Sequence, residues 1–291
     1  MPRGGVLGAR MEDAAQRHRL GVAWMVFTSL QFAVMGLWVK LVAAEVPSDE
    51  IVFWRSLVTF VVLLPFAMRT GEAFRPRAVR AMVLRGLTGT ASMMSYFYAI
   101  QRLPLGDAVM ISYASPLVVA LLSPWVLGER PSSRVWGALL LGFLGVALVA
   151  GPKFQADPLG VTAALATALF AGLAYLYVAE ASRTERNDTI VLWFAGIAAL
   201  VTSPALLPAP TVPSTGVAWT LTGVGLIGLT AQLTMTRAYQ YGAAASMSLY
   251  GYVTPVAAWG LGCLALGEPV SVQGAVGTVL VAVAGVIASR R

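Results

Sequence analysis

Long apolar stretches dominate the sequence, and short segments rich in proline, glycine and arginine separate them. Each stretch is close to the roughly 20 residues that an α-helix needs to cross the hydrocarbon core of a bilayer. The pattern therefore predicts an all-α integral membrane protein with ten transmembrane helices. The expected spans are residues 20–42, 50–68, 80–100, 104–127, 135–150, 158–180, 189–207, 217–239, 243–266 and 271–288.

The composition excludes several other classes of protein. Hydrophobic residues make up 58% of the 291 residues and charged residues 11%, whereas soluble domains have about 25% charged residues. With one cysteine, Cys263, and one histidine, His18, the chain has no Cys and His cluster for a metal. Gly223, Gly225 and Gly228 match the spacing of a dinucleotide fingerprint, but they lie inside an apolar span. We expect no cofactor, no metal and no enzyme activity.

The net charge of +7 comes from basic residues in the connecting segments. Ten spans would place Arg102 and Lys153 on one side of the membrane and fourteen arginines on the other. Because cytoplasmic segments carry the Lys and Arg excess, both termini are expected in the cytoplasm, with residues 1–19 as a cytoplasmic tail. The charge then reflects the orientation of the spans in a membrane, and no nucleic-acid partner is expected. The fourteen are Arg3, Arg10, Arg17, Arg19, Arg69, Arg75, Arg77, Arg80, Arg130, Arg134, Arg183, Arg186, Arg290 and Arg291.

The sequence also resembles itself at a shift of 139 positions, which predicts a first five-helix repeat over residues 20–150 and a second over 158–288. Because five is an odd number, the second repeat would be inverted relative to the first. Inverted repeats are a transporter architecture in which the substrate binds near the midplane and access alternates between the two sides. The shift pairs Gly21 with Gly160, Trp54 with Trp193, Gly89 with Gly228, Tyr113 with Tyr252, Pro116 with Pro255 and Glu129 with Glu268.

Pro116 and Pro255 lie at matching positions inside the fourth and ninth expected spans. Proline lacks an N–H and clashes with the carbonyl four residues earlier, so it would free the carbonyls of Ser112 and Gly251. Within a membrane, such groups need a protein partner or a water-filled cavity. We expect the two prolines to act as hinges beside a cavity; a kink that serves only packing is the alternative.

Polar and aromatic residues recur at helical spacing along several spans, as expected for stripes that face a cavity. Hydrogen bonds between neighbouring helices would explain individual members equally well. Together with the tyrosines beside the two prolines, they form the expected substrate-binding set: Gln31, Trp38, Ser92, Tyr96, Tyr98, Tyr113, Tyr175, Tyr177, Gln232 and Tyr252.

Four basic residues lie within the spans, and we expect them to snorkel to the membrane surfaces or to pair locally. Contact of one of them with a substrate carboxylate is the alternative. Glu129 and Glu268 follow glycines at span ends and are expected to be turn residues. The four basic residues are Lys40, Arg55, Arg85 and Arg237.

No carboxylate lies in the middle of a span, so none is available for a proton relay or as a Na⁺ ligand. This absence predicts uniport or exchange driven by the substrate gradient. The expected cavity also lacks the Arg and Lys cluster that phosphate would need. Amino acids and similar small metabolites fit a lining of Tyr, Trp, Ser, Thr and Gln.

The residues described above resemble the drug/metabolite transporter superfamily, specifically its ten-helix bacterial branch of EamA type. The resemblance rests on the duplication, Trp54 and Arg55, the stretch from Leu105 to Pro116, and Leu-Gly-Glu at residues 127–129 and 266–268. Aromatic and neutral amino-acid exporters of YddG type are the nearest match within that branch. The resemblance implies that helices 1, 3, 4, 6, 8 and 9 surround the cavity, whereas helices 5 and 10 support it. It also implies a multi-pass protein of a bacterial inner (plasma) membrane.

The sequence thus predicts a membrane carrier that exports amino acids and related small metabolites with broad selectivity. Uptake of a vitamin or nucleoside-like metabolite such as riboflavin is the alternative, and a non-transporting receptor or scaffold is a more distant one. The expected partners are a small-molecule substrate and the lipid bilayer. The oligomeric state stays open.

Overall fold

The computed structural model describes residues 3–42, 45–103, 105–151, 157–206, 214–265 and 270–289, and these residues form an all-helical bundle without strands. The helices of the first half of the chain are α1 (Arg3–Val42), α2 (Ser48–Thr70), η1 (Glu72–Phe74), α3 (Val79–Arg102), α4 (Leu105–Ser112), α5 (Ser115–Val126) and α6 (Ser133–Ala150). Those of the second half are α7 (Pro158–Ala181), α8 (Asn187–Thr202), η2 (Ser203–Leu206), α9 (Thr215–Tyr239), α10 (Ala244–Leu249), η3 (Tyr250–Tyr252), α11 (Val253–Ala265) and α12 (Val272–Ser289).

Several of these helices have the length and composition to cross a membrane. Six long apolar segments qualify within the described ranges, and α8 and α12 are shorter apolar helices. The six are Ala15–Val39, Ser48–Arg69, Ala108–Val126, Ser133–Ala150, Pro158–Ala181 and Thr215–Tyr239. The all-helical membrane class is therefore confirmed, whereas the number of ten spans stays a prediction.

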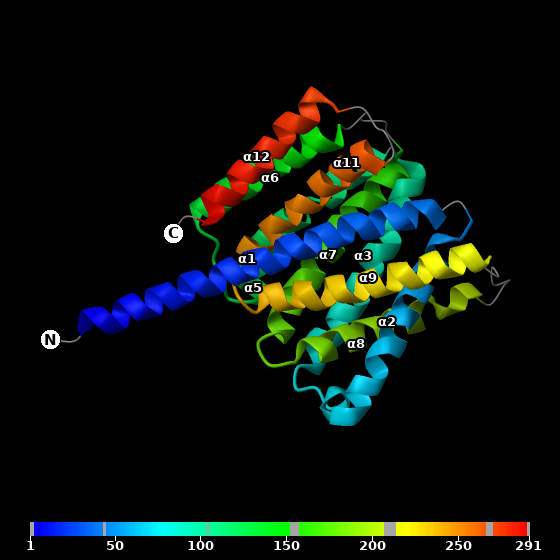
Figure 1. Cartoon of the computed structure of the whole chain (residues 1–291), viewed down its shortest axis with the longest axis horizontal. Coiled ribbons are helices and arrows are strands. Elements are labelled where there is room, and N and C mark those ends of the chain that lie inside the picture. Colours follow the sequence, from blue (N-terminus) through cyan, green and yellow to red (C-terminus); the bar gives the residue numbers. More distant parts are fainter. Residues whose placement is uncertain are drawn as a thin grey trace.

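Helix α1 is longer than the expected first span. It begins at Arg3 rather than near residue 20, so its first part continues as helix beyond the bundle (Figure 1). The beginning of α1 and the end of α12 lie at the same end of the bundle (Figure 1). This placement agrees with an even number of crossings; the cytoplasmic side for both termini stays a prediction.

The fourth and ninth expected spans are interrupted, each close to one of the two prolines singled out in the sequence. Helix α4 ends at Ser112 and α5 begins at Ser115, so Pro116 lies in the first turn of α5. The ninth span changes from α10 to the 3₁₀ turn η3 and then to α11, which contains Pro255. Proline is tolerated in a first turn, where its missing N–H would have no helical partner. Each proline therefore begins a new helix close to a break.

The helices pack in pairs that join the two halves of the chain. Helices α6 and α12 lie together at one edge of the bundle, and α2 and α8 lie at the other (Figure 1). Between these edges, α1 packs on α9 and α3 packs on α7. If the halves of the chain are exchanged at the shift of 139, α1 corresponds to α7 and α3 to α9, so each of these pairs maps onto the other. The centre of the bundle is built from both halves.

The contact between α6 and α12 depends on two glycines. A Cβ atom on Gly145 would lie 2.7 Å from the carbonyl oxygen of Gly277, and a Cβ on Gly277 would lie 2.5 Å from that of Gly145. Small residues at such positions let membrane helices approach until their backbones touch. Helices α6 and α12 are thus held together by direct backbone packing.

Replacing Gly145 with valine is expected to destabilise the protein, because the new side chain has no room between the two backbones. Overpacking of this kind costs about 1–3 kcal/mol. Gly137→Val on the same helix is the matched control, since a Cβ there meets nothing within 4 Å. Thermal unfolding in detergent should show a lower midpoint for Gly145→Val than for Gly137→Val, and equal midpoints would contradict the packing described here.

Candidate functional site

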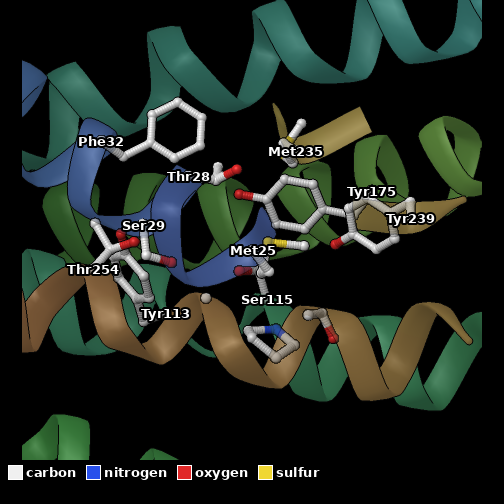
Figure 2. A pocket seen from close by; sticks show the side chains of 13 residues that line it. Met25, Thr28, Ser29, Phe32, Tyr113, Ser115, Tyr175, Met235, Tyr239 and Thr254 are labelled. Carbon is white, nitrogen blue, oxygen red and sulfur yellow. The ribbon is translucent and has the colours of Figure 1, made fainter. Parts of the chain in front are cut away.

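A pocket lies next to both helix breaks, and Figure 2 shows the side chains that line it. Residues from α1, α5, α7, α9, α10 and α11 line it, together with Tyr113 of the first break and Gly251 of the second. Both halves of the chain contribute. The complete lining is Met25, Thr28, Ser29, Phe32, Tyr113, Ser115, Pro116, Tyr175, Met235, Tyr239, Ser248, Gly251 and Thr254.

Helix α1 supplies one wall through residues at positions 25, 28, 29 and 32. This spacing of three, four and seven places the side chains on one face of the helix. Ser29 Oγ donates a hydrogen bond to the carbonyl oxygen of Tyr250 at 3.2 Å. The first helix is thereby attached to the 3₁₀ turn at the second break.

Aromatic rings form much of the remaining wall. The rings of Tyr175 and Tyr239 stack with centroids 6.1 Å apart and planes inclined by 28°, and Figure 2 shows them side by side. Tyr113 lies beside Thr254 on another side of the pocket (Figure 2). Such rings offer apolar faces for stacking and hydroxyls for hydrogen bonds.

Among the residues that the structure describes, no charged side chain lines the pocket. The lining combines hydroxyl groups, aromatic rings, methionines and the backbone of Gly251, a set that suits a small solute with both polar and apolar parts. The free volume is about 40 Å³, whereas pockets for drug-sized ligands measure about 300–1,000 Å³. The pocket is therefore contracted in this conformation, with room for water but not for an amino acid.

The structure brings part of the expected set to this pocket. Tyr113, Tyr175 and Pro116 line it. Pro255 does not, although its neighbour Thr254 does. One of the paired prolines therefore lines the pocket and the other lies next to a lining residue, whereas their role as hinges stays a prediction.

Gln31 is engaged in hydrogen bonds between α1 and α9. Its Nε2 donates to Thr230 Oγ1 at 2.8 Å, and Thr234 Oγ1 donates to its Oε1 at 2.8 Å. Gln232 is buried and accepts a hydrogen bond from Arg85 Nη2 at 2.8 Å. Neither glutamine lines the pocket, and Gln31 matches the alternative that polar stripes join neighbouring helices.

Tyr252 and Trp38 also lie outside the pocket. Tyr252 is completely buried, and its ring is so close to Gly142 of α6 that a Cβ there would lie 2.6 Å from it. Trp38 packs in the same way against the backbone of Gly223. A glycine on the facing helix accommodates each ring, so both rings serve packing in this conformation.

The expected residues of α3 and Tyr177 of α7 do not reach the pocket either. Ser92 Oγ donates to the carbonyl oxygen of Thr167 at 3.3 Å, and Tyr96 packs in an apolar cluster with Trp38. Tyr98 is 42% exposed, with the Arg102 guanidinium 4.9 Å from its ring centre. Tyr177 is half-buried outside the lining. A substrate role for these residues stays a prediction.

The interpretation of the charged residues within the spans needs correction. Arg55 and Arg85 are only 4% and 3% exposed, so neither snorkels to a membrane surface. Arg237, by contrast, is exposed and lies 5.7 Å from the ring centre of Tyr241. The side chain of Lys40, together with Lys153 and the Leu-Gly-Glu sequence at residues 266–268, lies outside the described residues.

Glu129 does more than form a turn. Its Oε1 accepts a hydrogen bond from Arg183 Nη2 at 3.0 Å, and its Oε2 accepts one from the backbone N–H of Ala244 at 3.0 Å. It thus connects the segment after α5 to the end of α7 and the start of α10. Glu185 similarly accepts hydrogen bonds from the backbone N–H groups of Arg77 and Ala78 before α3. The two carboxylates hold the halves of the chain together at one end of the bundle.

Sequence reasoning missed several pocket residues, among them Tyr239 and Phe32. The available signal was the spacing of residues 25, 28, 29 and 32 on α1 and of residues 235 and 239 on α9. That signal is weak because every face of these helices carries apolar residues, whether it meets lipid, protein or a cavity.

Comparisons with known proteins agree with this architecture. A model of the EamA-like transporter family matches residues 19–151 and 158–290. The pseudopaline exporter CntI of Pseudomonas aeruginosa is 31% identical over 272 residues, which cover 93% of this chain and 96% of that protein. An S-adenosylmethionine uptake transporter of Rickettsia prowazekii is 27% identical over 143 residues, 49% of either chain. A solved crystal structure has the same fold, with a TM-score of 0.78 at 22% identity over 93% of this chain and 98% of that one.

The family model matches nearly the whole chain, and the members of this family are transporters, which are not enzymes. The related bacterial proteins and the several apolar helices place this chain in the inner membrane as a multi-pass protein. Its cargo is accordingly a small molecule. The chain belongs to the EamA-like transporter family of the drug/metabolite transporter superfamily, and it is a membrane transporter.

Proposed function

We propose that this transporter exports amino acids and related small metabolites with broad selectivity, and that it works by alternating access around the pocket beside the two helix breaks. The observation that carries the proposal is the composition of the pocket lining. Tyr113, Tyr175 and Tyr239 supply rings, several hydroxyls supply hydrogen bonds, and no charged residue among those described fixes one type of cargo. An amino acid presents an apolar side chain together with polar groups, which such a lining can contact.

Alternating access is supported by how the two halves meet. We infer that residues 20–150 and 158–288 are inverted repeats, since the pair of α1 and α9 corresponds to the pair of α3 and α7 when the halves are exchanged. The pocket lies between the halves, as in inverted-repeat carriers. Its contracted volume of about 40 Å³ requires the walls to separate before cargo enters. Tyr113 at one break and Gly251 at the other belong to the walls that would move.

The direction of export is supported by the exporter among the relatives, which aligns along almost its whole length. Uptake by another relative shows that related carriers also run inward, and a gradient-driven carrier runs in either direction. Uptake of a flat-ring vitamin would use the same stacked tyrosines. No observation favours a receptor or scaffold.

The test is counterflow in proteoliposomes that contain the purified full chain. Vesicles loaded with an unlabelled amino acid should accumulate the labelled one without any imposed H⁺ or Na⁺ gradient, because no carboxylate lies in the middle of an expected span. A panel of amino acids, riboflavin and a nucleoside distinguishes the cargo classes, and protein-free vesicles give the background. Counterflow of riboflavin alone would exclude amino-acid transport. A strict need for a proton or sodium gradient would exclude the gradient-driven mechanism.

A further inference from the structure

Arg55 of α2 is a buried cation with few partners. Its side chain is 4% exposed, and among the described residues its Nη1 donates a hydrogen bond only to the sulfur of Met93, at 3.0 Å, while its Nε has no hydrogen-bond partner. A guanidinium offers five N–H donors, and a thioether sulfur is a weak acceptor. Most of the hydrogen-bonding capacity of this buried charge is therefore unused.

Arg85 of α3 is a second buried cation with the same character. Its Nη2 donates to Gln232 Oε1 at 2.8 Å, and its guanidinium carbon lies 4.0 Å from the ring centre of Phe194. Its Nε has no partner. The guanidinium also lies against the backbone of Gly89, where any side chain would displace it. Packing thus fixes its position without neutralising its charge.

Neither guanidinium forms an ion pair with an Asp or Glu in the part of the chain that the structure describes. Three arginines with more exposed side chains behave differently: Arg102, Arg183 and Arg186 each pair with a carboxylate. Arg55 contacts Met93 of α3, and Arg85 lies against Gly89 one turn earlier on the same helix, so the two guanidiniums are neighbours. Leaving buried charges uncompensated is costly, so this arrangement calls for an anion that is not part of the described chain.

One face of α9 connects these arginines to the pocket. Tyr239 and Met235 line the pocket, Gln232 binds Arg85, and a Cβ on Gly228 would lie 2.7 Å from Arg55 Nε. The positions 239, 235, 232 and 228 follow each other at spacings of four, three and four, so they share one face of the helix. This face of α9 therefore runs from the pocket to both buried cations.

We propose that Arg55 and Arg85 form a buried binding site for a carboxylate group of the cargo, which a solute in the pocket reaches along this face of α9. Guanidinium groups bind carboxylates through two parallel hydrogen bonds. The proposal rests on the proposed function at one point, namely that the bound anion is the transported cargo. It predicts a preference for solutes that carry a carboxylate over their amides.

The experiment measures thermal unfolding of the purified full chain in detergent with N-acetylphenylalanine or with its amide. The two probes share an aromatic ring and differ in the carboxylate. The free acid should raise the unfolding midpoint and the amide should raise it less or not at all, because only a ligand that binds the native state stabilises it. Equal shifts for both probes would overturn the proposal.

Arg55→Met and Arg85→Gln should abolish the shift caused by the free acid. Without ligand, Arg55→Met should unfold at the same or a higher temperature than the unmodified protein, because it removes a buried charge with no counter-ion. A purely structural role of Arg55 predicts a lower midpoint instead, with the ligand shift retained. Arg237→Gln, which removes an exposed arginine, is the control and should keep the full shift.

Arg55→Lys keeps the charge but loses the planar fork, so we expect at least about tenfold weaker binding of the free acid. This variant also serves if Arg55→Met does not fold. A control with chloride at equal ionic strength distinguishes cargo from an inorganic anion. If chloride alone raises the unfolding midpoint as much as the free acid does, the assignment of the site to cargo is overturned. If the unmodified protein shows no amino-acid counterflow but the free acid still raises its unfolding midpoint through the two arginines, the proposed function is refuted and the binding site stands. If both arginine variants show normal counterflow, the binding site alone is refuted.

Discussion

Replacing Tyr175 with alanine is expected to reduce amino-acid counterflow at least about tenfold while the protein still inserts and purifies normally. The ring lines the pocket and stacks on Tyr239 at 6.1 Å between centroids. The variant removes a ring on which the cargo can stack; such an aromatic contact contributes about 0.5–1.5 kcal/mol beyond the area that it buries, and a loss of about 1.4 kcal/mol in binding corresponds to a tenfold change.

The matched control for this prediction is Tyr177→Ala on the same helix. Tyr177 is a half-buried tyrosine two positions away, and it does not line the pocket. Counterflow should be measured as an initial rate per amount of reconstituted protein, at several cargo concentrations. Equal rates for Tyr175→Ala and the unmodified chain would remove the pocket from the transport path, whereas a large loss for Tyr177→Ala alone would place the path elsewhere.

Replacing Pro116 with alanine is expected to slow transport strongly while cargo binding is kept. Pro116 lies in the first turn of α5, just after the break at Tyr113. Alanine restores the backbone N–H and removes the clash with the carbonyl four residues earlier, so α4 and α5 can join into one continuous helix. A continuous helix at this position would limit the movement of a pocket wall.

The measurement for Pro116→Ala compares cargo-induced thermal stabilisation with counterflow. We expect the cargo to stabilise the variant about as much as it stabilises the unmodified protein, but the flux to fall about tenfold or more. Breaking the continuous helix in each transport cycle would cost about 1–2 kcal/mol, which corresponds to a change of about that size. Pro124→Ala, near the other end of α5, is the control because its position is away from the break. Unchanged flux in Pro116→Ala would exclude a hinge at this position.

The sequence was sufficient to predict the helices and the vicinity of the breaks. Backbone groups in lipid must be satisfied within the segment, so long apolar runs leave few alternatives to helices. The prolines at 116 and 255 have an equally direct local effect. Both predictions depend on properties of the chain itself rather than on which helices come into contact.

Which aromatic residues reach the pocket depends on contacts between distant segments. Tyr113 and Tyr252 correspond at the shift of 139, yet only Tyr113 lines the pocket. Tyr252 packs against Gly142, and the position that corresponds to Gly142 is Val281. A valine offers no such space for the ring of Tyr113. A single glycine on a facing helix therefore gives Tyr252 a packing site that the corresponding Tyr113 lacks.

The burial of Arg55 and Arg85 was beyond sequence reasoning for the same reason. Charged residues near expected span ends ordinarily reach the membrane surface. Here Gly228 on the neighbouring helix α9 leaves room for the Arg55 guanidinium, and Gly89, one turn further along α3, leaves room for that of Arg85. The sequence contains these glycines, but it does not show which helices they face.

Accessibility of Ser248 from each side of the membrane tests the central claim that the pocket opens alternately to both sides. Ser248 lines the pocket and is 3% exposed. With the single native cysteine replaced (Cys263→Ser) and Ser248→Cys introduced, a membrane-impermeant thiol reagent should label the protein in right-side-out and in inside-out vesicles, and cargo should slow both reactions. Labelling from one side only, whatever the cargo concentration, would contradict alternating access.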